Sequence, residues 1–574
     1  TQLPAPPMFD EALLPRHNEV AFWLHQAAEQ WPADAIYTDE TITRINARID
    51  SSIETTHRTD ASEKTQRSKI GARNKKFSNQ TTRKTRPPNV GARKHATSSS
   101  ESGLKLGDEQ RSEQNTRVDT RLCDFIHATI RPKTYTKEQA ARIEKRMRKG
   151  LAKYTFYAGE TVVNKKEVKK KWIPEAIDRL DDAQPAAELR GIIKDSPIYC
   201  FPSPLRGFDD PIDMAFDEWR CSQVKYGELV HVRAKTDLLW YVESDYTEGW
   251  IDPIDLSDTL APNDSGCTQP SKPSRNANLA KISSSKRPGD YKKNSTGHVQ
   301  LDNQAADLAD IIITTPQTLV WQIEDAHNGN QNKTHANTFT PTGKVLYQGT
   351  RLRPAPDNNL SLTPKQAKAR TKPATTAKDI IGPAADNFVA LRLATKTNWT
   401  TVYIDKSAIN TGTFTRADIL RRAFKQLNEP YGWGGEGSAR DCSRFIMDLF
   451  RSFGIWLPRP SHKQASTGLT SIDVSHLSNT EKKQRIKKIA KQGPLLLYFK
   501  GHIMLYVGSD NVGSEEDEAY VLHQISAYRK PCPYNPEKDI AWRLNRVVVS
   551  TLNLGAGSHR KSLIERITKV IIIK

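Results

Sequence analysis

The sequence predicts a multidomain α+β protein with a helical N-terminal region, two small β-barrels and a C-terminal α+β domain. Two observations predict this class. The chain is 574 residues long, which exceeds what one compact core holds, so three or four domains are expected. Helical patterns, groups of short strands and polar tracts also follow one another along the chain, as they do when separate domains are joined by linkers.

The boundaries of the predicted segments follow the changes in composition. Helical periodicity marks residues 119–189, and short β-type runs separated by turns mark residues 190–258. A second β-rich part, split by a polar insertion at about residues 355–385, could repeat the first barrel. In chain order we predict an N-terminal segment (1–50), a basic low-complexity insertion (51–118), a helical N-terminal domain (119–189), a first barrel (190–258), a polar linker (259–308), a second barrel with its insertion (309–408) and the C-terminal domain (409–574).

The net charge of +20 is concentrated in one tract. Between residues 64 and 94 the chain has eleven Lys or Arg residues and no acidic residue. Within residues 51–118, this tract could bind an anionic polymer, anionic lipid or nucleic acid. Phe77 is its only aromatic side chain, and nucleic acid is therefore the less favoured partner because bases would have little to stack on. The alternative, a solvated insertion without a specific partner, stays open.

The spacing of the cysteines and the length of the apolar segments exclude several classes of protein. The six cysteines are scattered without a Cys-x-x-Cys pair, so neither a zinc ribbon nor a dense disulfide scaffold is expected. No apolar run approaches the roughly 20 residues that a membrane helix needs, and no membrane span is expected. The chain begins at Thr1 rather than Met, so either a leader has been removed or the sequence is a fragment; of the two, we expect an exported protein of the periplasm or cell envelope that has lost its leader.

One stretch of the C-terminal domain has the features of a nucleophile site. Residues 431–435 (Tyr-Gly-Trp-Gly-Gly) form a glycine turn, and Asp441, Cys442 and Ser443 follow it. A helix is then marked by apolar residues at helical spacing, Phe445, Ile446, Leu449, Phe450 and Phe453. Cys442 would therefore lie in the first turn, where exposed N–H groups and the helix dipole favour an anionic sulfur and can receive an oxyanion.

Of the 14 histidines, His502 is the best placed to act as a base. It opens a strand over residues 501–508 and points away from the aliphatic face of that strand. A second strand ends at His523, which could hydrogen-bond His502 and hold it in one tautomer. The alternative is that Cys442 is a small buried hydrophobe and that both histidines are satisfied core residues.

At these residues the C-terminal domain resembles the NlpC family of papain-like cysteine peptidases, in particular the bacterial subgroup with SH3-like domains before the catalytic domain. The first barrel, with its runs Gly-Glu-Leu-Val-x-Val, Leu-Trp-Tyr-Val and Gly-Trp-Ile, resembles such an SH3-like domain. The resemblance of the C-terminal domain is carried by residues 431–435, 440–443 (Arg-Asp-Cys-Ser), 454–459 (Gly-Ile-Trp-Leu-Pro-Arg), Ser461, Gln464, 501–508 and His523.

The resemblance implies hydrolysis of γ-D-glutamyl-diamino-acid bonds in peptidoglycan stem peptides or muropeptides, without a metal or organic cofactor. Cys442 would be the nucleophile of a Cys-His-His triad, His502 its general base and acid, and His523 the residue that orients His502. Tyr431 would lie beside the thiolate and help to stabilise the oxyanion.

The resemblance also implies a pocket for the free amine of an N-terminal L-alanine. Its predicted substrate-binding residues are Asp441, Ser443, Ser461 and Trp433. Aromatic residues of the first barrel, with Trp240 and Tyr241 as candidates, would narrow this pocket. Arg444 stands where the family often has glycine, and would either alter access or bind a substrate carboxylate.

Two other functions remain as alternatives. One is a non-catalytic protein that binds the cell wall or an anionic polymer through a degenerate peptidase domain. The other is an acyltransferase that uses the same thiol, which is disfavoured because relatives with that activity commonly have the histidine before the cysteine.

Overall fold

The computed structural model describes residues 13–30, 37–38, 40–51, 125–209, 213–261, 311–324, 338–352, 355, 388–409, 415–511 and 517–574. Most of the predicted insertion at 51–118, nearly all of the linker at 259–308 and the polar insertion at about 355–385 lie outside these residues. The prediction of anion binding by the basic tract therefore stays a prediction. Within the described residues, no helix has the length and apolar character needed to cross a membrane.

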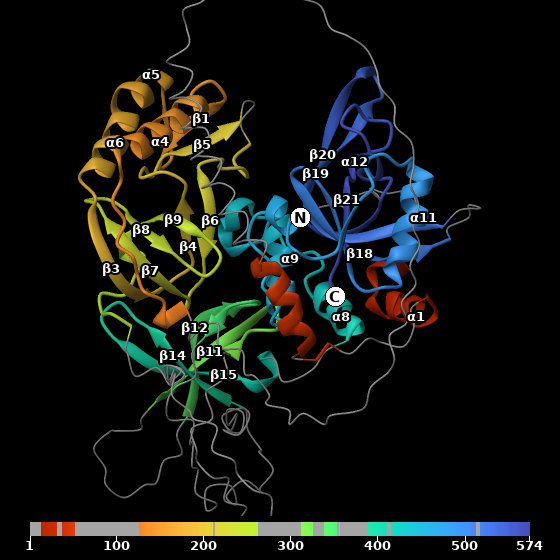
Figure 1. The fold of residues 1–574 in the computed structure, drawn as a ribbon, viewed down its shortest axis with the longest axis horizontal. Helices are drawn as coiled ribbons and strands as arrows, with labels where there is room; N and C mark the ends of the chain where they lie inside the picture. Colours follow the sequence, from red (N-terminus) through yellow and green to blue (C-terminus); the bar gives the residue numbers. More distant parts are fainter. Residues whose placement is uncertain are drawn as a thin grey trace, which may run out of the picture.

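The N-terminal segment packs on the C-terminal domain, at the far end of the chain (Figure 1). It contains α1 (Val20–Gln30) and a helix over residues 40–51. Trp23 is fully buried in the core that also contains residues of the C-terminal helices and sheet. The hydroxyl of Tyr37 donates a hydrogen bond to the carbonyl of Ile573, 3.0 Å away. The N-terminal segment therefore contributes to the core of the C-terminal domain.

The predicted helical domain mixes helices with a small sheet. Thr136 caps α4 by accepting a hydrogen bond from the backbone N–H of Gln139, whose side chain bonds back to the cap. The chain leaves helical structure at Asp181, and residues 184–191 form a strand of the first barrel region rather than a helix. The elements are α4 (Lys137–Gly150), β1 (Tyr154–Ala158), β2 (Thr161–Val163), α5 (Lys165–Glu167), a π-helical turn (Val168–Trp172), α6 (Ile173–Asp181) and β5 (Arg206–Asp209), with the sheet order β2-β1-β5.

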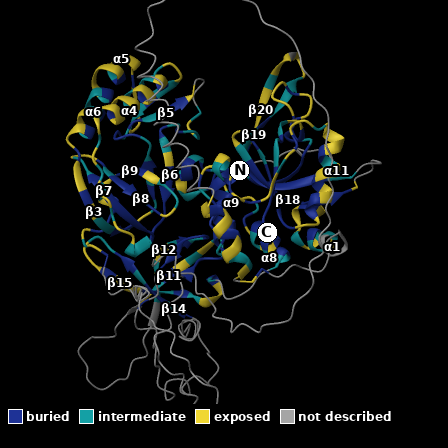
Figure 2. Cartoon of the chain, in the orientation of Figure 1, coloured by how far each residue is buried: buried dark blue, intermediate teal, exposed yellow. Residues whose placement is uncertain are grey.

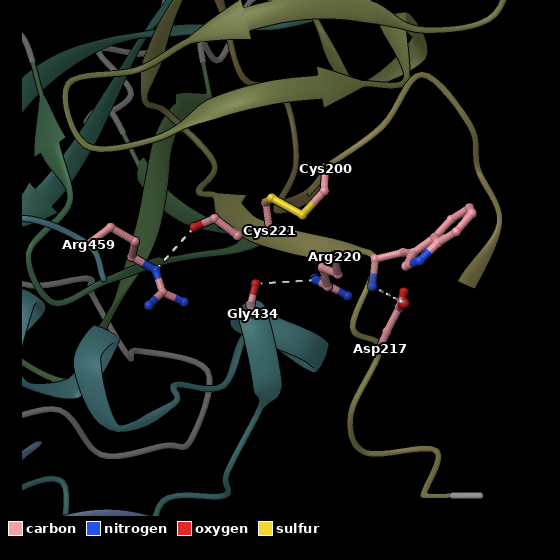
Figure 3. The surroundings of a disulfide bond; sticks show 8 residues. Cys200, Asp217, Arg220, Cys221, Gly434 and Arg459 are labelled. Atoms are coloured by element: carbon pink, nitrogen blue, oxygen red, sulfur yellow. Dashed lines mark hydrogen bonds between the residues drawn. A yellow bond between two sulfur atoms is a disulfide. The ribbon is translucent and has the colours of Figure 1, made fainter. Parts of the chain in front are cut away.

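The first β-rich region is one six-stranded antiparallel sheet in the order β3-β7-β8-β9-β4-β6. Its core consists of aliphatic side chains such as Val230, Val232 and Ile251. A disulfide between Cys200 and Cys221 joins the chain after β4 to β6 (Figure 3). The strands are β3 (Gln184–Gly191), β4 (Ser196–Tyr199), β6 (Arg220–Val224), β7 (Leu229–Lys235), β8 (Trp240–Glu243) and β9 (Glu248–Ile251).

The second β-rich region has a four-stranded sheet in the order β12-β11-β15-β14 and a two-stranded pair, β10-β13. Leu391, Leu393 and Ile404 alternate into its core. Both regions are β-rich, as predicted, and their strands pair antiparallel, while the SH3-like barrel topology stays a prediction. The strands are β10 (Ile311–Ile312), β11 (Gln317–Glu324), β12 (Thr338–Tyr347), β13 (Arg351–Leu352), β14 (Phe388–Ala394) and β15 (Trp399–Asp405).

The C-terminal domain is a six-stranded sheet covered by helices on both faces. One core packs α8 and α9 against the sheet, and a second core packs α11 and α12 against the other face; Figure 2 shows the buried strands between more exposed helices. The sheet order is β16-β21-β17-β18-β19-β20. The elements are α8 (Arg416–Phe424), a 3₁₀ segment (Trp433–Ser438), α9 (Cys442–Arg451), α10 (Ser461–Gln464), β16 (Ser471–Asp473), α11 (Asn479–Ala490), β17 (Leu495–Phe499), β18 (His502–Asp510), β19 (Glu518–Cys532), β20 (Asn535–Thr551), α12 (Leu563–Arg566) and β21 (Lys569–Ile572).

A buried ionic cluster around Asp448 of α9 joins the first β-rich region, the second β-rich region and the C-terminal domain. Lys225 follows β6 of the first β-rich region, and its Nζ donates to Oδ2 of Asp448 at 2.7 Å and to the carbonyl of Gln348 in the second β-rich region at 2.8 Å. Arg440 and Arg444 donate to the same carboxylate oxygen at 3.0 and 3.1 Å. Helix α9, which lies between the β-rich regions and the C-terminal sheet in Figure 1, is therefore anchored on both sides.

Candidate active site

Cys442 is the first residue of α9, as the sequence predicts. Asp441 precedes the helix as its N-cap and accepts a hydrogen bond from the backbone N–H of Arg444 at 2.8 Å. The sulfur of Cys442 lies 4.0 Å from the carbonyl oxygen of Gly501, next to the start of β18. The thiol is thus placed between the mouth of the helix and the strand that begins with His502.

The glycine turn before Cys442 is held by the first β-rich region. Gly434 and Gly435 have φ values of 58° and 91°, which favour glycine. A Cβ on Gly435 would lie 2.5 Å from the Cβ of Gln223 on β6. Arg220 on β6 donates a hydrogen bond to the carbonyl of Gly434 at 3.3 Å (Figure 3). It also donates to the carbonyl of Gly435 at 3.3 Å and forms an ion pair with Glu436. The turn therefore has its shape because another domain packs against it.

His502 and His523 form the hydrogen bond that their strands make possible. Nε2 of His502 and Nδ1 of His523 are 2.9 Å apart. Nε2 of His523 lies 3.0 Å from the hydroxyl of Ser550 on β20, and that hydroxyl donates to the carbonyl of Thr551 at 3.2 Å. The four groups form one continuous series of hydrogen bonds across β18, β19 and β20.

The direction of this series sets the tautomers of both histidines. The Ser550 hydroxyl can donate its single proton to the carbonyl of Thr551, and in that arrangement it accepts from Nε2–H of His523. His523 then has an unprotonated Nδ1, which accepts from Nε2–H of His502. Nδ1 of His502 is consequently the nitrogen without a proton, and no hydrogen bond within the described part of the chain occupies it. An imidazole in this state can take a proton from a thiol.

Ser550 is a residue that the sequence analysis missed, because a lone serine in a β-strand carries no recognisable signal. Replacing it with alanine should leave Nε2 of buried His523 without an acceptor. We expect kcat to fall by about 2- to 10-fold, as the loss of one ordinary hydrogen bond implies, with KM unchanged. The control is Ser509→Ala, which removes a hydroxyl bonded to Tyr506 in the same sheet. Steady-state kinetics of the two variants check this, and an equal loss in both would contradict it.

Burial dominates the protonation of the central pair. It raises the pKa of the Cys442 thiol to about 12, with Asp441 adding to the effect and nearby backbone N–H groups opposing it. Burial also lowers the pKa of His502 to about 3, with Arg566 and Arg560 contributing in the same direction. Burial thus opposes the thiolate that the sequence predicts, because the loss of hydration disfavours the charged sulfur while the backbone N–H groups at the helix start favour it. Burial therefore favours the neutral thiol and the neutral imidazole.

Cys442 and His502 line one cleft, of about 660 Å³, together with Tyr431 and Trp433. The Tyr431 hydroxyl has its pKa raised, first by burial and then by the neighbouring Cys442. Phe216, from the loop before β6 of the first β-rich region, packs its ring 5.6 Å from that of Tyr431 and 5.3 Å from that of Trp433. The cleft thus lies between the C-terminal domain and the first β-rich region.

Trp240 and Tyr241, which the sequence analysis names as candidates to narrow the substrate pocket, are not among the residues that line this cleft. Tyr241 is buried in another cluster, where its ring packs 5.3 Å from that of Trp250. Trp240 lies under Lys235, whose Nζ is 4.1 Å from the ring centroid. Phe216 takes this place instead, because the loop between β5 and β6 faces the glycine turn. The alternating strand pattern used in the prediction does not reveal where a loop points.

Asp441 and Ser443 are turned inward, away from the cleft that contains Cys442. Arg459 donates two hydrogen bonds to the Asp441 carboxylate, at 2.6 and 3.0 Å, and one to the Ser443 hydroxyl at 2.8 Å. The Nε of Arg459 donates to the hydroxyl of Ser222 on β6 at 3.1 Å. Ser461 is the first residue of α10 and is not among the residues that line this cleft. A carboxylate already paired with a guanidinium is a poor acceptor for a substrate ammonium.

Arg444 is also internal. Only 2% of it is exposed, its Nη1 donates to the carbonyl of Gln223 at 3.0 Å, and its guanidinium lies 4.6 Å from the ring of Tyr246. Arg444 is thus part of the buried contact between α9 and the first β-rich region. A guanidinium buried there neither controls access to the cleft nor reaches a substrate carboxylate.

Comparison with known proteins identifies the C-terminal domain. Residues 428–529 match the NlpC/P60 family. Over 114 residues the chain is 31% identical to a Bacillus cereus protein named gamma-D-glutamyl-L-lysine dipeptidyl-peptidase, covering 18% of this chain and 32% of that one. Over 108 residues it is 30% identical to peptidoglycan endopeptidase RipB of Mycobacterium tuberculosis, covering 16% and 39%.

A solved structure of an NlpC/P60 endopeptidase from Photobacterium damselae subsp. piscicida is 13% identical, with a TM-score of 0.49 over 78% of this chain and 88% of that one. The matched part of this chain spans about a third of the length of the two curated relatives. The C-terminal part of the chain, over residues 428–529, is therefore an NlpC/P60 domain.

Proposed function

We propose that this protein is a cysteine peptidase that hydrolyses γ-D-glutamyl-diamino-acid bonds in peptidoglycan stem peptides or muropeptides, and that it acts in the periplasm or cell envelope. The observation that carries the proposal is the cleft in which the Cys442 thiol and His502 lie together, with the unprotonated Nδ1 of His502 available as a base. The names of the two relatives, which refer to a γ-D-glutamyl bond and to peptidoglycan, support the substrate class.

In the first half of the reaction, the sulfur of Cys442 attacks the carbonyl carbon of the scissile amide. The thiol proton moves to Nδ1 of His502 at the same time, because burial favours the neutral form of the pair. The oxyanion is stabilised by backbone N–H groups at the start of α9 and by the hydroxyl of Tyr431. His502 then gives its proton to the leaving amine, and a thioester with Cys442 remains.

In the second half, water hydrolyses the thioester. His502 takes a proton from water as its oxygen attacks the thioester carbon, and returns that proton to the departing sulfur. His523 and Ser550 keep Nδ1 of His502 directed at the reacting groups through both halves. Trp433 lies beside the bound peptide as part of the cleft wall.

For the free amine of the substrate, Glu218 fits better than the predicted Asp441, Ser443 and Ser461. Glu218 is half-buried, lines the cleft and has no ion-pair partner among the described residues. Burial raises its pKa to about 6, with Asp209 and Asp217 adding to the effect. A bound ammonium group would stabilise the ionised form of this carboxylate. We therefore assign the N-terminal amine to the wall that the first β-rich region supplies.

The experiment is to incubate the protein with a stem peptide that has a free N-terminal L-alanine and with its N-acetylated form, and to identify the products by mass spectrometry. We expect cleavage between D-glutamate and the diamino acid, with the free peptide preferred. If Cys442→Ala protein binds muropeptides and the unmodified protein cuts neither peptide, the non-catalytic alternative is correct.

Replacing Glu218 with glutamine is expected to reduce kcat/KM for the free peptide by roughly 10- to 100-fold, the value of a hydrogen bond to a charged group, and to leave the acetylated peptide unaffected. In the unmodified protein, KM for the free peptide should rise as the pH falls through about 6, because Glu218 becomes neutral. Kinetics at several pH values test both points. Glu160→Gln, at an exposed turn, is the control, and an unchanged preference in Glu218→Gln would refute the assignment.

A further inference from the structure

One wall of the cleft is strongly basic. The residues that line the cleft include three acids: Asp209 at the end of β5, and Asp213 and Glu218 in the loop between β5 and β6. The opposite wall has six cations from the C-terminal domain: Lys500, Arg529, Arg543, Arg560, Lys561 and Arg566. A substrate that bridges the two walls would therefore have a positive end and a negative end.

The basic wall is largely built outside the matched NlpC/P60 residues. The match ends at residue 529, whereas Arg543 lies on β20 and Arg560, Lys561 and Arg566 lie in or beside α12. β20 is the strand next to β19 in the sheet, and α12 packs on the face of the sheet opposite α9. The family match thus does not account for this wall.

Arg566 is held in place by stacking. Its guanidinium carbon is 3.9 Å from the ring centroid of Phe499, and that ring lies 5.4 Å from the ring of His502. Stacking uses the face of the guanidinium and leaves its N–H groups free at the edge. The Phe499 ring therefore lies between Arg566 and His502, the proposed base, and fixes the position of the Arg566 guanidinium.

Arg560 and Arg566 are both without an anion. Neither forms an ion pair or a side-chain hydrogen bond with any residue that the structure describes, whereas Arg543 pairs with Asp213 across the cleft at 2.8 Å. Arg566 is half-buried and Arg560 is exposed beside it; burial, with repulsion from Arg560, lowers the pKa of Arg566 to about 10. A bound anion would relieve this repulsion.

We propose that Arg566 and Arg560 form a subsite for a substrate carboxylate next to the scissile amide, so that the preferred substrate is a short peptide with a free carboxylate at that position. This rests on the proposed function. A planar carboxylate matches the fork of Arg566 in a bidentate manner. Because His502 delivers the proton to the leaving amine, the carboxylate nearest this wall is the one on the residue that supplies that amine.

The test uses L-alanyl-γ-D-glutamyl-L-lysine with a free or an amidated lysine carboxylate. Binding of both peptides to Cys442→Ala protein is measured by calorimetry, and cleavage of both by the unmodified protein is measured by mass spectrometry. We expect the free acid to bind about 10- to 100-fold more tightly than the amide, as a charge-assisted bond implies. Arg566→Gln and Arg560→Gln, each in the Cys442→Ala background, should reduce that preference, while Lys488→Gln on exposed α11 should keep it.

The outcomes separate this inference from the proposed function. If the unmodified protein cuts both peptides and Cys442→Ala binds them equally, the peptidase stands and the carboxylate subsite is refuted. If neither peptide is cut but the free acid binds more tightly through Arg566, the subsite stands and the peptidase is refuted. Arg566→Lys, which keeps the charge without the fork, should recover only part of the preference; full recovery would refute the bidentate geometry.

Discussion

Replacing Cys442 with alanine is expected to lower kcat on a stem peptide by about 10⁶-fold, the loss seen when the nucleophile of a hydrolase is removed. The reason is that the thioester can no longer form, and water alone would have to attack an unactivated amide. His502→Ala should cost a similar factor, because a neutral thiol whose pKa is raised to about 12 needs the imidazole to accept its proton. Single-turnover kinetics with mass-spectrometric detection measure both.

The double variant sharpens this prediction. Cys442 and His502 act as one unit, so Cys442→Ala with His502→Ala should be no slower than either single variant. Cys532→Ala is the matched control, since Cys532 is the other free cysteine in the described part of the chain and does not line the cleft. If Cys532→Ala loses activity while Cys442→Ala keeps it, the assignment of the nucleophile is wrong.

Replacing Asp448 with alanine is expected to destabilise the protein by about 3–5 kcal/mol, the cost of removing one partner from a buried ion pair. Asp448 is 1% exposed and accepts from Lys225, Arg440 and Arg444, so its loss leaves three buried cations without their shared anion. Chemical denaturation, followed by the fluorescence of the tryptophans, measures the change in the free energy of unfolding.

A surface pair provides the comparison for Asp448. Asp237 lies 3.3 Å from Arg179 and its side chain is 76% exposed, so Asp237→Asn should change stability by less than about 1 kcal/mol. The surrounding cations hold the pKa of Asp448 well below its usual range, so its contribution is present above pH 4 and is lost only when the pH falls through that lowered pKa. Equal effects of the two substitutions would show that the cluster does not anchor α9.

The local features of the site could be read from the sequence. Apolar residues at helical spacing placed Cys442 at the start of α9, and the strand patterns placed His502 and His523 on β18 and β19, which pair in the sheet. These predictions succeeded because helix and strand periodicity is a property of neighbouring residues. The same reasoning predicted the two β-rich regions, but it placed the end of the helical domain inside β3, because an amphipathic strand that crosses a domain boundary has no compositional mark.

Tertiary structure alone decided what the site residues contact. The sequence by itself determined a thiol at a helix mouth and two histidines on strands, because both follow from local periodicity. It did not determine that Asp441 is paired with Arg459, or that Ser550 orients His523. It likewise did not determine that the first β-rich region supplies Phe216 and Glu218 to the cleft. The physical reason is that these contacts join residues tens to hundreds of positions apart, and their energy comes from packing and charge pairing between domains, which no local pattern records.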